Sequence, residues 1–233
     1  MKRFQFVNGS LLKLIALAAM LLDHTASILL KDNYFVVLEI GSHQIDLYML
    51  FRYIGRISFP IYAFLLVEGF LHTSDVRRYA GNLLIFALLS ELPWNLAHSG
   101  KLLYPNQNVM FTLLFGLLGI WVIREFRTQR TKQACGLLAL LALSFFFHAD
   151  FGWTGFGLIL ALFLLRGSRL HQTVVGTCFF ASNWTAAFGF VPVALYNGKR
   201  GFVSNRFLKY AFYAVYPLHL LVLYFIRRAT IGY

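Results

Sequence analysis

The chain has 233 residues, of which 59% are hydrophobic and 13% are charged. Soluble domains usually carry about a quarter charged residues, so this composition excludes an ordinary soluble domain and indicates a protein with several membrane spans. The net charge of +12 does not by itself indicate a nucleic-acid partner, because Lys and Arg collect in the cytoplasmic loops of membrane proteins and face anionic lipid there. We expect membrane lipid, and no nucleic acid, as a partner.

Nine apolar segments follow one another along the chain. A bilayer core of about 30 Å needs about 20 apolar residues per helix, and the segments lack the strand-like alternation of a barrel. The two cysteines lie in such apolar runs, and we predict free thiols. We therefore predict an all-α, polytopic transmembrane helical bundle in one domain, with segments at 10–30, 47–71, 78–98, 107–125, 132–148, 151–166, 169–181, 184–196 and 208–227.

The seventh and eighth segments are short, and they form either two short helices or one long bent helix. The loop charges give the orientation, because cytoplasmic loops carry an excess of Lys and Arg. With a cytoplasmic N-terminus and nine spans, the outer side carries only Lys31, Lys101, Arg227 and Arg228. Eight spans would move the last two residues inside but would disturb the other loops. With nine spans, the cytoplasmic side carries Lys2, Arg3, Arg77, Arg78, Arg124, Arg127, Arg130, Lys132, Arg166, Arg169, Lys199, Arg200, Arg206 and Lys209.

The first segment contains the stretch KLIALAAMLLDHTASILL, which places Asp23 and His24 in its outer half. An ionised Asp in the middle of a membrane helix costs about 2.5–3.5 kcal/mol, so such a residue usually faces the bundle interior or a wet cavity. Lys13 and His24 are close to three helical turns apart and share one face, which we expect to line the interior of the bundle. Asp23 is rotated by about 100° from His24, so we expect it to pair with a neighbouring helix. Simple hydrogen bonding of both residues to other helices is the alternative.

The second segment reads RYIGRISFPIYAFLLVEGFLHT. Arg52 and Arg56 are four residues apart and face the same way, toward the outer end, where Arg side chains also snorkel to headgroups. Pro60 should kink the helix. Glu68 and His72 lie near the inner end, where they either line a site or anchor the helix at the interface.

The third and fourth segments add polar groups. Glu91 lies in the outer half of the third segment, and we expect it to pair with one of the two arginines of the second segment. Asn108, Thr112 and Gly116 form a stripe of polar and small residues at a spacing of four, which is more typical of helix packing than of chemistry.

Three further residues are candidates to line a site. Asp150 lies in an outer loop, and Tyr216 and His219 lie three residues apart in the last segment. A lone intramembrane His is often only hydrogen-bonded, and we favour that role for His219.

Two pairs of basic residues lie in loops on the inner side, namely Arg77 with Arg78 and Lys199 with Arg200. They predict a polyanionic donor held on the cytoplasmic side, with the chemistry taking place deeper in the bundle. The His and carboxylate spacings indicate no metal site, and the motifs of the common soluble enzymes are absent.

Six stretches along nearly the whole chain resemble the TraX family of bacterial membrane proteins. They are LIALAAMLLDH, IGRISFPIYAFLLVEGFLHT, LLIFALLSELPWNLA, DFGWTGFGLIL, LYNGKRG and KYAFYAVYPLHLL. The family takes its name from the conjugal transfer protein that acetylates the N-terminus of F-type pilin, and it looks like a compact relative of the broader membrane acyltransferases.

The resemblance implies one integral-membrane acyltransferase domain over residues 1–233 in the bacterial plasma (inner) membrane. It also implies acyl-CoA, here acetyl-CoA, as the donor substrate, with no metal. The acceptor stays open between an amine, such as a pilin N-terminus, and a hydroxyl of a surface glycan. A His on an early helix is the usual catalytic candidate in the broader group, and His24 is the position that fits.

These expectations combine into a mechanism. His24 acts as a general base, or forms a covalent acyl intermediate, and Asp23 or Glu91 holds its tautomer. Arg52 or Arg56 stabilises the charge that develops on the thioester oxygen, and the four basic loop residues hold the CoA phosphates. Two other readings stay open, namely a proton-coupled transporter and a membrane assembly subunit without catalysis.

Overall fold

The computed structural model describes residues 5–31, 36–40, 43–203 and 205–230, without the side chains of residues 36–40, 43–45 and 206. Lys2 and Arg3, which enter the orientation argument, lie outside this part of the chain, as does the side chain of Arg206.

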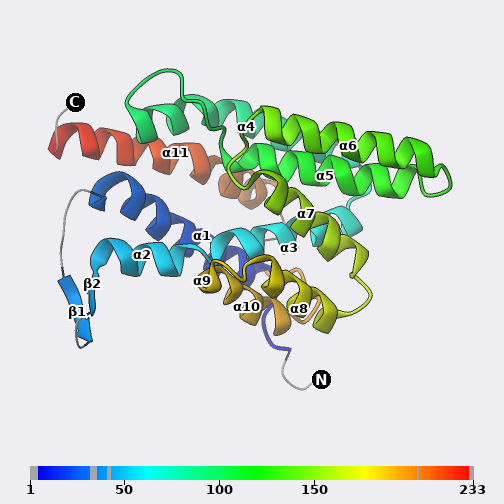
Figure 1. Ribbon diagram of the computed structural model, residues 1–233, viewed down its shortest axis with the longest axis horizontal. Coiled ribbons are helices and arrows are strands. Elements are labelled where there is room, and N and C mark those ends of the chain that lie inside the picture. Colours follow the sequence, from blue (N-terminus) through cyan, green and yellow to red (C-terminus); the bar gives the residue numbers. More distant parts are fainter. Residues whose placement is uncertain (1–4, 32–35, 41–42, 204, 231–233) are drawn as a thin grey trace.

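The described chain is helical apart from one β-hairpin (Figure 1). The first half contains α1 (Gly9–Thr25), its π-helical continuation η2 (Ala26–Leu30), the hairpin strands β1 (Val36–Ile40) and β2 (His43–Asp46), α2 (Leu47–Gly55), α3 (Ser58–His72) and α4 (Val76–Ser99). The second half contains α5 (Val109–Glu125), α6 (Arg130–Phe146), α7 (Gly152–Leu164), α8 (Arg169–Phe179), α9 (Trp184–Ala187), α10 (Phe190–Ala194) and α11 (Arg206–Thr230).

Each of the nine predicted apolar segments coincides with a helix or a pair of consecutive helices. The seventh and eighth segments are separate short helical stretches, α8 and the pair α9 and α10, rather than one bent helix. The antiparallel hairpin between α1 and α2 was not predicted.

Polar side chains fix where several helices begin. Asn8, Asp46, Asp75, Asn108 and Ser168 each precede a helix and accept a hydrogen bond from a backbone N–H of its first turn. Such N-caps satisfy donors that have no partner within the helix.

The break between α2 and α3 confirms the kink expected at Pro60. Proline lacks an N–H, and its ring clashes with the carbonyl four residues earlier, which here belongs to Arg56. The helix accordingly ends at Gly55 and resumes at Ser58.

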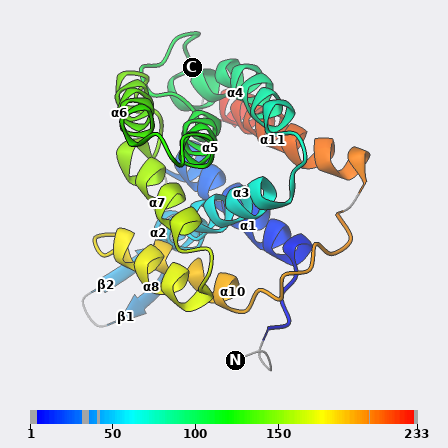
Figure 2. The same ribbon diagram turned by 90° about the vertical axis from the view of Figure 1, so that its right-hand side faces the viewer.

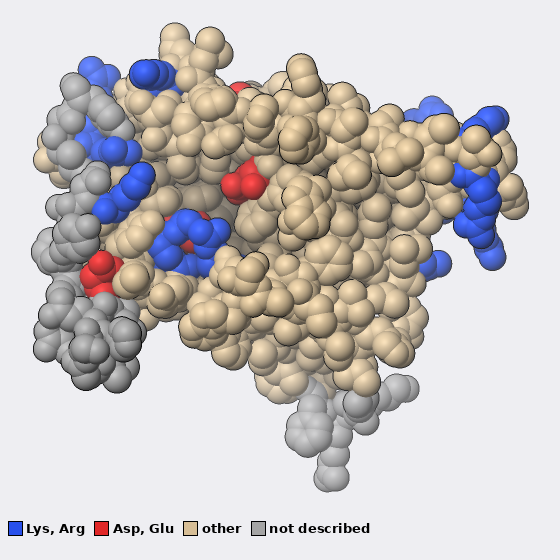
Figure 3. Space-filling view, viewed as in Figure 1, with Lys and Arg blue, Asp and Glu red and all other residues tan. Residues whose placement is uncertain are grey.

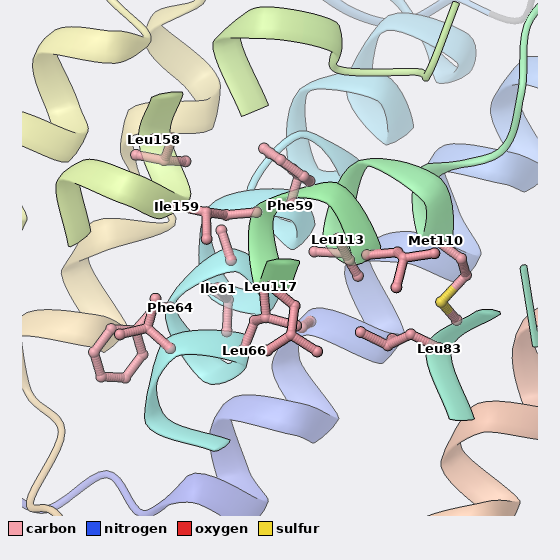
Figure 4. Packing of buried hydrophobic residues seen from close by; sticks show 14 of the residues in the cluster. Phe59, Ile61, Phe64, Leu66, Leu83, Met110, Leu113, Leu117, Leu158 and Ile159 are labelled. Carbon is pink, nitrogen blue, oxygen red and sulfur yellow. The ribbon is translucent and has the colours of Figure 1, made fainter. Parts of the chain in front are cut away.

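Helix α3 lies at the centre of the bundle. Its apolar side chains pack against α5 and α7, as Figure 4 shows for Phe59 and Ile61 of α3, Leu117 of α5 and Ile159 of α7. Viewed from the side (Figure 2), α1 and α3 lie in the middle of the molecule, with α4, α5, α6 and α11 on one side and α8 and α10 on the other. Because α1 and α3 occupy the interior, their polar residues are in a position to line an internal site.

Three stretches are long and apolar enough to cross a membrane, namely Gly9–Leu30, Leu47–His72 and Phe207–Thr230. Figure 3 shows Lys and Arg side chains gathered at the two ends of one face, with a wide uncharged belt between them that is interrupted by a hollow containing charged groups. By contrast, α8 has 11 residues and extends only about 16 Å. Nine complete spans therefore stay a prediction.

Candidate functional site

A cavity of about 930 Å³ lies among α1, α2, α3, α4, α5 and α11. Its lining runs along α1 from Gly9 and Lys13 to His24 and continues to Ser27 of η2. At about 1.5 Å per residue, Lys13 and His24 are about 16 Å apart along the helix. The cavity thus joins a basic end to a buried histidine.

Three cations, Lys13, Arg200 and Lys209, line the basic end. The loop that carries Arg200 is attached to the start of α1: Ser10 Oγ donates to the Arg200 carbonyl at 3.0 Å and accepts from the Val203 N–H at 2.7 Å. The charges of Arg200 and Lys209 act on Lys13, so the three groups form one positive region.

The predicted donor residues divide between two places. Arg200 lines the cavity, whereas Arg77, Arg78 and Lys199 are exposed on the surface outside the lining. The sequence analysis placed Lys13 on the same inward face as His24, but it gave neither Lys13 nor Lys209 a role in the site, because their charges alone do not distinguish a cavity wall from a membrane interface.

Two predicted lining residues near this end, Glu68 and His72, do line the cavity. Glu68 Oε1 lies 3.7 Å from Nη2 of Arg169, whose guanidinium packs over the rings of Phe64 and Tyr196. Because Arg169 holds this carboxylate, none of Lys13, Arg200 and Lys209 forms an ion pair with a carboxylate of the described residues.

His24 lies deeper in the cavity and is only 8% exposed. Its Nδ1 is 2.6 Å from Nε2 of His219, and His219 Nδ1 donates to the Val215 carbonyl at 2.8 Å. His219 itself does not contribute to the described cavity lining. The rings of Trp94 and Tyr216 pack edge-on against His24 and enclose it.

Asp23 makes the interhelical ion pair that its position predicts. Arg52 Nη1 donates to Asp23 Oδ2 at 2.7 Å, and both side chains are about four-fifths buried. The approach of α2 is close, since a Cβ on Gly55 would meet the Cβ and Cα atoms of Asp23. Arg56 also lines the cavity and has no carboxylate within 4 Å in the described part of the chain.

Glu91 is not the partner of either arginine, and that prediction is wrong. Its Oε2 accepts from Asn108 Nδ2 at 2.8 Å, and the same amide donates to the Ala87 carbonyl at 2.9 Å. Thr112 Oγ1 accepts from the Phe151 N–H at 3.4 Å. Glu91, Asn108 and Thr112 lie outside the described lining of the cavity and connect helices.

Asp150 lines the far end of the cavity, together with His98, Tyr104 and Asn106. Its side chain is accessible from the cavity but surrounded by protein atoms, and this burial raises the pKa of the Asp150 carboxyl to about 6. The positive charge of Arg56 opposes that shift. His98 was missed in the sequence, although it follows Glu91 by two helical turns and so shares its face.

Tyr216 is 2% exposed and lines the cavity. Among the described atoms, none lies at a hydrogen-bonding distance and angle from its hydroxyl oxygen. Three histidines, His24, His98 and His219, lie near one another. Even so, no group of three or more His, Cys, Asp or Glu residues in the described ranges has the geometry to hold a metal ion.

Comparison with known proteins gives the family. The model of the TraX family, described as TraX protein, matches residues 8–227. The chain belongs to the TraX family. All the cavity-lining residues named above fall inside the region that the TraX model matches.

In addition to matching the family model, the chain is similar to a probable fimbrial assembly protein FimC, serogroup H1, from Dichelobacter nodosus. The two are 29% identical over 242 residues, which cover 91% of this chain and 92% of that protein. No solved structure matches the chain.

Proposed function

We propose that this TraX-family protein is a membrane-embedded acyltransferase, which moves an acetyl group from cytoplasmic acetyl-CoA to an amine or hydroxyl acceptor. The observation that carries the proposal is the single cavity that joins three cations at one end to His24 about 16 Å deeper. A donor with a polyanionic head and a thioester at the end of a long arm fits that arrangement.

Lys13, Arg200 and Lys209 bind the phosphates of the donor. Hydrogen bonds between such cations and phosphate oxygens are charge-assisted, and the guanidinium of Arg200 binds in a bidentate manner. Arg77, Arg78 and Lys199 lie outside the cavity, and their role is to attract the anionic donor toward its entrance.

His24 takes the proton of the acceptor as the acceptor nitrogen or oxygen attacks the thioester carbonyl carbon. The carbon–sulfur bond then breaks, and the CoA thiolate leaves with the proton that His24 returns. Arg56, which pairs with no carboxylate of the described residues, stabilises the carbonyl oxygen, whereas Asp23 holds Arg52 in place. A covalent acetyl-His24 intermediate with the same residues is the alternative route.

We place the protein in the bacterial inner membrane with its N-terminus in the cytoplasm and its C-terminus outside. The uncharged belt and the three long apolar stretches support this placement. The helices α8, α9 and α10 are too short to cross individually, and we propose that they enter from the cytoplasmic side and return to it. This arrangement keeps both termini on the sides that nine spans would give.

The fimbrial assembly relative favours a pilin-type subunit, rather than a surface glycan, as the acceptor. In that case the group that is acetylated is a free amine at the end of the subunit.

The test is acetyl transfer by the purified chain in lipid, with acetyl-CoA as donor and a peptide with a free N-terminal amine as acceptor. His24→Ala should fold and bind acetyl-CoA, while turnover falls by about 10²–10⁴, the usual contribution of a positioned acid or base. The matched control is His171→Ala, because His171 is exposed on α8 outside the cavity lining. Transfer by folded His24→Ala at the parental rate would exclude His24 as the base.

The donor end is tested in the same preparation. Lys13→Gln combined with Lys209→Gln should weaken acetyl-CoA binding by at least about tenfold, because each charge-assisted contact contributes about 1.5–3 kcal/mol. Arg77→Gln combined with Arg78→Gln should change it less. If no variant changes binding, and no acetyl-CoA is cleaved with any acceptor, the chain is a transporter or an assembly subunit instead.

A further inference from the structure

The imidazoles of His24 on α1 and His219 on α11 are joined by a hydrogen bond that the mechanism above does not use. The two nitrogens are 2.6 Å apart, and the rings are parallel to within 1°. The residues lie 195 positions apart in the sequence, so the pair exists only in the folded bundle.

The direction of this hydrogen bond follows from the partner on the other side of His219. A backbone carbonyl can only accept, so the Nδ1 atom that lies 2.8 Å from the Val215 oxygen carries a proton. A neutral imidazole has one protonated nitrogen, and Nε2 of His219 is therefore an acceptor. His24 Nδ1 must donate to it.

The neutral state of His219 is supported by its surroundings. A doubly protonated His219 would donate from both nitrogens and would reverse the bond, but a buried imidazolium needs an anionic partner. His24, Tyr216 and the Val215 carbonyl lie against His219, and its ring forms no ion pair with a carboxylate among the described residues.

With its Nδ1 proton donated to His219, His24 has its lone pair on Nε2. That atom has no hydrogen-bond partner among the described residues, and His24, unlike His219, lines the cavity. We propose that His219 is a positioning residue that holds His24 in the Nδ1–H tautomer. Nε2 of His24 is then the atom that takes the proton from the molecule that receives the acetyl group. The role of His24 as the base rests on the proposed function. The tautomer of His24 follows from the hydrogen bonds alone and does not depend on that function.

His219 performs the task that the Asp carboxylate performs in a Ser-His-Asp triad, but it is a neutral hydrogen-bond acceptor rather than a charged one. When Nε2 gains a proton, His24 becomes an imidazolium and its Nδ1–H becomes a charge-assisted donor to His219. The bond therefore strengthens when charge develops on His24, and no proton has to pass to His219. Asp23 does not serve this purpose, since it is paired with Arg52 on another face of α1.

The direct test is nitrogen NMR of the full chain in lipid, with histidine labelled with ¹⁵N at both ring positions. The difference between the spectra of the parent and of His24→Asn identifies the His24 signals. We expect a protonated Nδ1 and an unprotonated Nε2 on His24. In His219→Leu the tautomer should shift toward Nε2–H or become mixed. An Nε2–H tautomer of His24 in the parent would overturn the inference, whether or not the chain transfers acetyl groups.

The kinetic test uses two variants of His219. The amide oxygen of Gln occupies a place similar to that of Nε2 of His, so His219→Gln keeps an acceptor for His24, whereas His219→Leu removes it. We expect His219→Leu to lower kcat by about 10–100-fold, the usual effect of losing an orienting partner, with the KM for acetyl-CoA unchanged, and His219→Gln to recover most of the rate. Equal loss in folded forms of both variants would overturn the positioning role. Loss of activity in every protein including the parent would instead contradict the proposed function, while the NMR result would still decide the tautomer.

Discussion

Asp150 is an ionisable residue at the far end of the cavity, and its surroundings change its pKa. Protein atoms surround its carboxyl and raise its pKa to about 6, against about 3.9 for an unperturbed Asp. The folded protein therefore retains this proton over a range of pH in which the unfolded chain has lost it.

This difference predicts how stability depends on pH. Between about pH 4 and pH 6 the folded state binds more protons than the unfolded state at this site, so the contribution of Asp150 to stability falls as the pH rises. Asp150→Asn removes that dependence. In thermal unfolding from pH 4 to pH 7, the melting temperature of Asp150→Asn minus that of the parent should become more positive as the pH rises. A difference that is constant or becomes more negative would show that Asp150 is not held in its protonated form.

At the scale of single residues, the sequence predicted the ion pair of Asp23 and the place of His24 on an inward face, because burying a charge in an apolar helix requires a partner or a cavity. It assigned the wrong partner to Glu91, since a carboxylate can accept from an amide as well as from an arginine. The contact of His24 with His219 could not be found from spacing, because helical periodicity says nothing about which helices become neighbours.

At the scale of elements, α1 and α2 approach closely at one point. Gly55, the last residue of α2, lies against the backbone and Cβ of Asp23, and no side chain fits between them. This contact places Arg52, three residues earlier on α2, within 2.7 Å of the Asp23 carboxylate. The glycine is therefore part of the geometry of the ion pair.

Gly55→Ala should separate the two helices. We expect it to lower the melting temperature and the acetyl-transfer rate together, because the added methyl group must displace the main chain of α1 or α2. The control is Gly81→Ala in α4, where an added Cβ meets no atom within 4 Å. That change should raise stability by about 0.5–1 kcal/mol, as is usual for Gly to Ala within a helix. Parental stability in Gly55→Ala would mean that the helices are not in tight contact there.

The order and approximate limits of the helices were predictable, because long apolar runs, N-caps and Pro60 act locally. The hairpin of β1 and β2 was not, because its strands of five and four residues are too short to give a signal beside 20-residue apolar runs. The contact between α11 and α1 could not be predicted from sequence patterns either.

At the scale of the whole molecule, the proposed topology is open to a labelling experiment. Cys135 and Cys178 are free and exposed, so both must first be replaced by Ser. A single Cys at Arg127 should then resist an impermeant thiol reagent added to intact cells, whereas one at Lys101 should react, because the two loops lie on opposite sides. The reverse pattern would contradict the orientation, and with it the side from which the donor enters.

The depth of His24 has an electrical consequence. Under the proposed placement, His24 lies about 16 Å from the basic end of the cavity, which is about half of a bilayer core of about 30 Å. A proton that leaves His24 toward either side crosses about half of the membrane voltage, which amounts to about 1 kcal/mol at 100 mV. An N-terminal ammonium must lose one proton in addition to the proton that His24 returns to the thiolate, and if that proton leaves on the side opposite to the acceptor, the membrane voltage enters the energetics of each turnover.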